Sequence, residues 1–155
     1  MINFFFEAAY GIDDSQDDTA YNYDDEYLSD EEEEIANDKS QVEMGQYMDQ
    51  CIPCTYEDLA RDPEMYIGKK VSITGEVYLI WNEEGNTMTF NMHTKKVGSG
   101  DYQYYLGGGV CIQYTRTKNE NRVLEDDEVV VYGEYKGLHK NYNSPFIIAK
   151  YVIVY

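Results

Sequence analysis

Two cysteines at a CxxC spacing, Cys51 and Cys54 in "CIPC", are the residues whose spacing most directly suggests metal or redox chemistry. A tetrahedral zinc site needs four ligands. The third cysteine and the two histidines do not form a second closely spaced pair. A thioredoxin-type pair lies within a βαβ unit, and the surrounding pattern is not of that kind. We interpret both as linker cysteines, expect no metal and no cofactor, and leave open whether they form a disulfide.

Aromatic side chains are the second candidate chemistry, because exposed rings stack on nucleobases and sugars. The chain has 17 tyrosines and one tryptophan. The tentative ligand-binding aromatics are Tyr78, Trp81, Tyr102, Tyr104 and Tyr105. Tyrosine is also an ordinary strand residue, so a purely structural role stays open for this cluster.

Basic residues complete the candidate site with Lys95, Lys96 and Arg116. Contacts to phosphates supply most of the nonspecific affinity for nucleic acid. Residues 51–155 contain 14 acidic and 11 basic residues, a net charge of −3. The interpretation as solvated charges at strand edges is therefore favoured, and a local basic face remains an alternative.

The sequence offers little for catalysis. It has two histidines, no G-x-S-x-G motif and no glycine-rich loop that leads into a helix. The "LGGGV" stretch at 106–110 lies within a predicted strand, where we interpret it as a bulge or a close approach of backbones. We expect a protein that is not an enzyme.

The charge is concentrated in residues 1–50, which contain 16 acidic residues and one basic residue, a net −15. Residues 11–44 have too little apolar surface to offset the entropy lost on ordering, so we predict a disordered acidic arm. We divide the chain into this arm or linker, 1–50, and a folded domain, 51–155. A spacer is the favoured role for the arm, with an autoinhibitory segment or a mimic of the nucleic-acid backbone as alternatives.

No apolar run approaches the ~20 residues of a membrane helix. The opening "MINFFFEAAYGI" has neither a basic start nor an adequate apolar stretch, so it is no signal peptide as written. We expect a cytoplasmic protein as the sequence stands, and an extracytoplasmic, membrane-anchored one if an upstream signal is missing.

The folded domain begins with a short helix and continues as strands. Thr55 and Asp58 have the spacing of a capping box, and Pro63 suits the first position of a second turn. Five strand-like runs follow, at 70–81, 86–94, 104–115, 128–138 and 146–154, separated by turn-forming segments.

Two glycines predict how these strands are arranged. The segments "VSITGE" and "VVVYGE" place Gly75 and Gly133 at equivalent positions of the first and fourth runs. By the alternation of side chains along a strand, both positions face inward. A glycine at an inward position lets a long strand bend sharply. The fold class we predict is mainly β, a five-stranded OB-like barrel preceded by a short helix. In this barrel the face of the second and third strands would carry the tyrosines of "DYQYYLGGG".

Three blocks of the sequence resemble a known family: "YEDLARDPEMYIGKKVSITGEV", "RVLEDDEVVVYGEYKGL" and "PFIIAKYVIV". Over residues 54–155 the chain is similar to the OB-like domains of Gram-positive bacteria that include the C-terminal domain of the clostridial toxin-operon negative regulator. The resemblance implies a non-catalytic barrel displayed at the end of a linker, behind a membrane anchor or lipoprotein signal. It does not assign binding residues, and the anchor is not visible in this sequence.

Three functions stay open. The first is a non-catalytic binding module for single-stranded nucleic acid or another extended ligand. The second is an acidic inhibitor or adaptor, of viral origin in one version, that binds a basic protein. The third is a structural domain displayed on the cell envelope. The sequence does not set the oligomeric state.

Overall fold

The computed structural model describes residues 30–117 and 119–155, with side chains described from residue 40 onward. The helices are α1 Asp30–Gln50, α2 Tyr56–Arg61 and α3 Pro63–Tyr66. The strands are β1 Ile52–Pro53, β2 Lys70–Glu84, β3 Thr87–His93, β4 Lys96–Ser99, β5 Tyr102–Tyr105, β6 Val110–Thr115, β7 Glu128–Leu138 and β8 Pro145–Val154.

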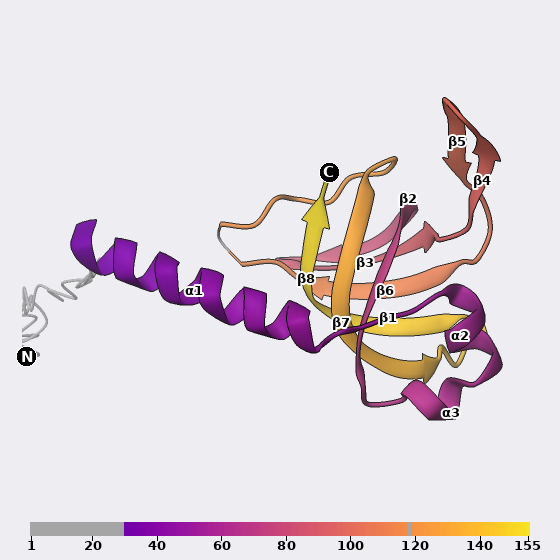
Figure 1. Cartoon of the computed structure of the whole chain (residues 1–155), viewed down its shortest axis with the longest axis horizontal. Coiled ribbons are helices and arrows are strands. Elements are labelled where there is room, and N and C mark those ends of the chain that lie inside the picture. The colour runs from indigo at the N-terminus through magenta and orange to yellow at the C-terminus, as the bar shows by residue number, and fades with distance from the viewer. Residues whose placement is uncertain (1–29, 118) are drawn as a thin grey trace, which may run out of the picture. The chain divides into compact units, whose positions relative to one another are not determined.

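Five strands close into a barrel (Figure 1). The order is β2-β3-β6-β8-β7, and β7 returns to pair with β2. The β6–β8 pair is parallel, and the other four pairs are antiparallel. A closed five-stranded barrel with this order is an OB fold. The predicted fold class is confirmed.

The alternation predicted for the strands defines the core. Along β3, buried Met88, Phe90 and Met92 alternate with partly exposed neighbours. The first half of β2 alternates in the same way, with Val71, Ile73 and Val77 inside. Since side chains of one strand point alternately to its two faces, the remaining residues of β3 form the outer face of the barrel.

Gly75 and Gly133 lie where the backbones of neighbouring strands come very close. At Gly75, β2 is about to leave β7, because the next residue, Glu76, pairs with both Glu128 of β7 and His93 of β3. A Cβ on Gly75 would lie 2.4 Å from the His93 carbonyl oxygen, and one on Gly133 would lie 2.3 Å from that of Ile148. Both glycines are buried, as their predicted inward positions require, and the close approach of backbones leaves no room for a Cβ. The bend expected at these glycines stays a prediction.

The predicted helix is present beside the barrel (Figure 1), and its Leu59 packs into the core. The Asp58 N–H donates to Thr55 Oγ1, and the Asp58 carboxylate accepts from the Thr55 N–H, so the capping box is complete. Leu59 of α2 is fully buried, and its carbonyl oxygen accepts a 2.8 Å hydrogen bond from the buried Tyr135 hydroxyl. The same hydroxyl thus fixes α2 to β7.

Two predicted segments differ from the structure. The run at 104–115 is two strands, β5 and β6, separated by a loop in which Gly107 and Gly108 have positive φ. Residues 96–99, predicted as loop, pair with β5 in a separate two-stranded sheet that stands away from the barrel (Figure 1). Glycines with positive φ end a strand, and the sequence pattern alone did not show this.

The acidic arm also differs in part. Residues 1–29 lie outside the described residues, while α1 begins at Asp30, within the segment predicted to lack regular structure. Glutamate, alanine, glutamine and methionine are good helix formers, which accounts for a helix in so charged a segment. No helix of the described residues is long and apolar enough to cross a membrane.

Candidate functional site

The outer face of β2, β3 and β6 is the place where an OB fold offers a binding surface. Here β3 and β6 are the second and third barrel strands, and residues 139–144 connect the fourth strand to the fifth. One row of paired positions crosses four strands, because Leu79 is paired with Asn91, Asn91 with Cys111 and Cys111 with Phe146. Leu79 is exposed at one end of this row, whereas Cys111 is buried. This row lies between two groups of aromatic side chains.

The first group is a stack of Tyr78 on His93. Their ring centroids are 3.9 Å apart and their planes differ by 15°. The backbone N–H of Gly107 donates to His93 Nδ1, which fixes the imidazole ring. Tyr78 keeps 40% of its surface exposed, so the stack presents an open ring.

The second group centres on Trp81. The Tyr142 ring packs edge-on against Trp81, with centroids 5.8 Å apart, and stacks on His139 at 5.1 Å. His139 in turn contacts Phe146 edge-on at 5.3 Å. Trp81 and Tyr142 remain 42% and 62% exposed. The two groups together, Tyr78, His93, Trp81, His139, Tyr142 and Phe146, are called the aromatic face below.

The backbone around His139 holds Tyr142 in position. The His139 N–H donates to the Ser144 carbonyl at 2.7 Å, and the His139 carbonyl accepts from the N–H groups of Tyr142 and Asn143. Asn143 has a positive φ of 51°, which asparagine tolerates in a tight turn. Tyr142 is therefore presented by a hydrogen-bonded turn.

The other predicted tyrosines lie elsewhere. Tyr102 and Tyr104 are on the β4–β5 hairpin, where they are 85% and 55% exposed. The prediction placed them on the face of the second and third barrel strands. They are instead carried by the connection between these strands, because the glycine loop at 106–109 separates β5 from β6.

Lys95, Lys96 and Tyr105 are brought together at a cleft of about 500 Å³ between the start of α2, the first half of β2 and the hairpin. Their polar groups are already engaged. Lys95 forms a 2.7 Å ion pair with Glu57, and the Lys96 ammonium lies over the Tyr105 ring at 5.4 Å. The Tyr105 hydroxyl donates to Glu128 at 2.9 Å, and burial together with this carboxylate raises the pKa of Tyr105 to about 12.

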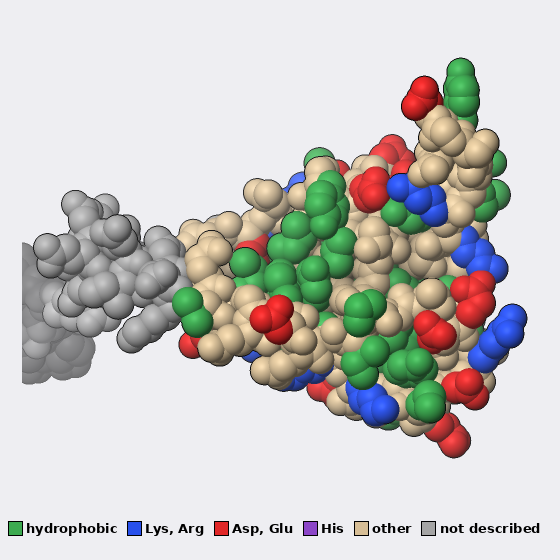
Figure 2. All heavy atoms as spheres, in the orientation of Figure 1, with side chains coloured by type: hydrophobic (Ala, Val, Ile, Leu, Met, Phe, Trp, Pro, Cys, Tyr) green, Lys and Arg blue, Asp and Glu red, His purple; other side chains and the backbone are tan. Residues whose placement is uncertain are grey.

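Arg116 follows β6 and lines a smaller pocket at the turn between β2 and β3. Its backbone N–H donates to the Asn86 carbonyl at 2.9 Å. The structure therefore places the predicted basic residues in two separate regions. On the face shown in Figure 2, basic side chains are scattered among acidic ones and do not form a continuous basic surface.

The cysteines show no sign of activation. All three thiols are free. Burial raises the pKa of Cys51, and it raises the pKa of Cys54 and that of Cys111 to about 11. A reactive thiol needs a lowered pKa, so these are poor nucleophiles at neutral pH. Among the described residues, no group of three metal-ligating side chains is close enough to hold an ion.

Sequence reasoning missed His93, His139, Tyr142 and Phe146 as members of a binding face. A signal was available for Tyr142, because the turn-forming segment "KNYNSP" at 140–145 separates the fourth and fifth strand-like runs, and in an OB fold this loop borders the binding surface. The stacks themselves depend on the register of β2 against β3, which shifts twice between Val77 and Asn82. The sequence does not reveal these shifts.

No family model matches this chain, and neither does any curated protein. The resemblance to the Gram-positive family therefore stays a prediction. Among solved structures, the chain is similar to the small single-stranded DNA-binding protein from Streptomyces coelicolor, with a TM-score of 0.41 and 15% identity over 57% of this chain and 92% of that one. It is also similar to OBody AM3L09, solved bound to hen egg-white lysozyme, with a TM-score of 0.38 and 16% identity over 58% and 84%. These are distant likenesses, and the fold assignment rests on the strand order described above.

Proposed function

We propose that the barrel is a non-catalytic binding module that holds single-stranded nucleic acid on its aromatic face. The observation that carries this proposal is the pair of exposed aromatic groups along one face of β2, Tyr78 on His93 and Trp81 against Tyr142. Each base stacked on an aromatic side chain contributes about 1–3 kcal/mol, nearly independent of sequence. Two such positions favour an extended, unpaired strand over a duplex, whose bases are already stacked.

The low net charge of the barrel domain determines how much electrostatic attraction contributes to binding. With a net charge of −3 for residues 51–155, long-range attraction of phosphates is weak. Stacking therefore provides most of the affinity. We expect moderate affinity, little preference among base sequences, and a salt dependence weaker than that of strongly basic DNA-binding proteins.

The experiment is fluorescence anisotropy of labelled oligonucleotides of about 15 nucleotides, both DNA and RNA, titrated with the full chain at about 50 mM salt. We expect Trp81→Ala and Tyr142→Ala each to weaken binding about fivefold to a hundredfold, the equivalent of one lost stacking contact. The matched control is Tyr155→Ala, since Tyr155 is an exposed tyrosine at the end of β8, outside the aromatic face.

Equal loss in all three variants would show that the aromatic face is not the site. No binding of either DNA or RNA by the unmodified chain would remove the proposal altogether. A duplex of the same length serves as the competitor that should bind less well.

A second function is favoured by the net charge of −15 in residues 1–50. In this alternative the acidic arm binds a basic protein or screens the barrel from nucleic acid. Deleting residues 1–37 leaves Tyr47 and its 5.6 Å edge-on contact with Tyr151 in the chain, so the barrel should stay folded. Tighter oligonucleotide binding after deletion would identify an autoinhibitory arm, unchanged binding a spacer.

A further inference from the structure

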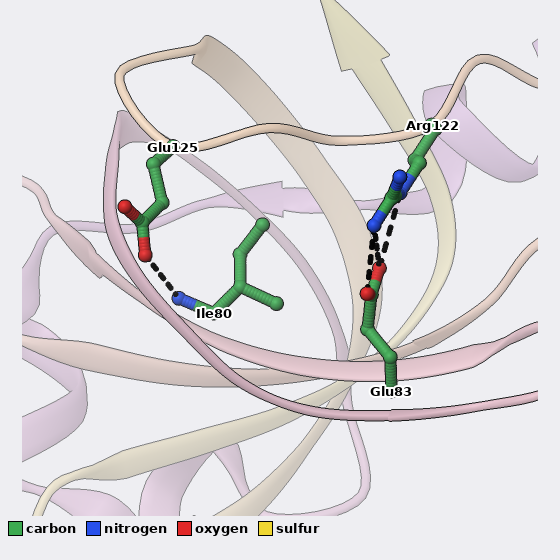
Figure 3. A network of polar contacts seen from close by, with 4 residues as sticks. All are labelled: Ile80, Glu83, Arg122 and Glu125. Carbon is green, nitrogen blue, oxygen red and sulfur yellow. Dashed lines mark hydrogen bonds and ion pairs between the residues drawn. The ribbon is translucent and has the colours of Figure 1, made fainter.

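Two side chains of the connection between β6 and β7, Glu125 and Arg122, form hydrogen bonds with the second half of β2 (Figure 3). Beyond Glu76, β2 no longer pairs with β7. Asp126 and Asp127 supply backbone hydrogen bonds to Val77 at 2.7 and 2.9 Å in its place. Further along, the Ile80 N–H donates to Glu125, and Arg122 donates to both carboxylate oxygens of Glu83.

The Arg122–Glu83 pair lies in a pocket that contains a second arginine. This pocket of about 210 Å³ is lined by Glu83, Arg116 and Arg122 together with the turn at 85–87. Arg122 is held at 2.7 Å by Glu83, whereas no ion pair within 4.0 Å joins Arg116 to a described side chain. Both members of the pair are partly exposed, so the pair is open to a competing anion.

The position of the pocket suggests which anion competes. Glu83 follows Trp81 by two residues on β2, a separation of about 7 Å along a strand. The pocket itself is lined by Met88 and the turn at 85–87, and no side chain of the aromatic face lines it. A guanidinium group binds a carboxylate and a phosphate with the same bidentate geometry, through two parallel N–H···O hydrogen bonds. A strand whose base stacks on Trp81 would bring its own phosphodiester to this pocket.

We propose that Arg116 and Arg122 form a phosphate-binding pocket. In this pocket the Glu83 carboxylate competes with phosphate for Arg122, so a phosphodiester must displace Glu83 before it binds. The inference rests on the proposed function for the identity of the ligand. Glu83 then weakens the binding of an isolated phosphate, since little free energy is gained when one anion replaces another at Arg122. An extended strand has the additional energy of stacking on the aromatic face.

The test is a double-mutant cycle on the full chain with the same oligonucleotide assay. Glu83→Gln frees Arg122 and should tighten binding about twofold to fivefold, the range of an exposed ion pair. Arg122→Gln should weaken binding and lower the slope of log Kd against log salt by about one. In the Arg122→Gln background, Glu83→Gln should have almost no effect.

The matched control is Glu134→Gln. Glu134 forms a similarly exposed ion pair, at 2.6 Å with Lys136 on β7, and its replacement changes the net charge by the same amount. If Glu83→Gln and Glu134→Gln tighten binding equally, or if the gain persists without Arg122, the effect is general electrostatics and the inference is overturned. Circular dichroism melts check that the barrel of each variant stays folded.

A separate readout distinguishes failure of the pocket from failure of the proposed function. The chain has three arginines, and Arg61 on α2 serves as an internal reference. Titration of 15N-labelled Glu83→Gln protein with pyrophosphate should shift the Nε signals of Arg116 and Arg122 and leave that of Arg61 in place. Absence of these shifts contradicts the pocket, even where oligonucleotides bind. Shifts without oligonucleotide binding support the pocket and remove nucleic acid as its ligand.

Discussion

Gly75 and Gly133 occupy two places in the barrel where the backbones of neighbouring strands approach too closely for a side chain. A Cβ at either position would meet a carbonyl oxygen at 2.4 or 2.3 Å, and backbone atoms cannot yield as a flexible side chain would. The need for glycine here is steric, because neither residue has a positive φ. This explains why a regular strand carries a glycine at its middle.

Replacing either glycine by alanine should destabilise the barrel by about 1–3 kcal/mol, the usual cost of overpacking. Urea denaturation measures the change in the free energy of unfolding. Gly45→Ala in α1 is the control, since a Cβ there meets nothing within 4 Å and alanine favours a helix. A Gly75→Ala variant as stable as the unmodified chain would contradict the close approach.

The Tyr135 hydroxyl is the second residue on which the fold depends. It is buried and donates to the Leu59 carbonyl at 2.8 Å. Tyr135→Phe keeps the ring and leaves that carbonyl without its donor, so we expect a loss of about 1–2 kcal/mol in thermal or urea unfolding. Tyr155→Phe, at an exposed position, should be neutral. Equal stability of both variants would contradict a contribution of this hydrogen bond to stability.

At the scale of elements, the capping box of α2 gives stability that depends on pH. The Asp58 carboxylate accepts from the N–H and the hydroxyl of Thr55, and these hydrogen bonds lower its pKa. A pKa lowered in the folded state stabilises the fold above the pKa of the unfolded state, and this contribution is lost as pH falls through the folded value. Thr55→Ala should cost about 1 kcal/mol at neutral pH.

Asp58→Asn tests the pH dependence. We expect the difference in stability between Asp58→Asn and the unmodified chain to shrink as the pH is lowered below about 4, where the carboxylate becomes protonated first in the unfolded state and then, at lower pH, in the folded state. Denaturation curves at a series of pH values give this difference. A difference that stays constant down to pH 3 would show that the charge of Asp58 has no role.

The sequence predicted those elements whose signals are local. The capping box, the proline at the start of α3 and the alternation of β2, β3, β7 and β8 are all read from neighbouring residues. The β4–β5 hairpin was missed because Gly98 and Gly100 mark a turn without showing that the flanking residues pair. The aromatic face was only partly predicted, since Tyr142 reaches Trp81 from a loop about 60 residues away in sequence, a separation that local patterns do not bridge.

At the scale of the whole molecule, the charge is unevenly divided between the acidic arm and a nearly neutral barrel domain. Residues 1–50 carry −15 and residues 51–155 carry −3. A near-neutral OB barrel with exposed aromatic side chains fits a ligand recognised mainly through stacking. We expect the arm to affect the solubility of the chain and its response to salt, and deletion of residues 1–37 separates its contribution from that of the barrel.

The central claim is that bases stack on the aromatic face, and Trp81 allows this to be measured without any label. It is the only tryptophan of the chain, so its fluorescence reports on this face alone. Titration with unlabelled single-stranded oligonucleotide should quench the emission in a saturable way, with a midpoint that matches the anisotropy titration and moves to higher concentration as salt is raised. Binding detected by anisotropy with no change in the emission of Trp81 would contradict the claim and place the ligand on another surface.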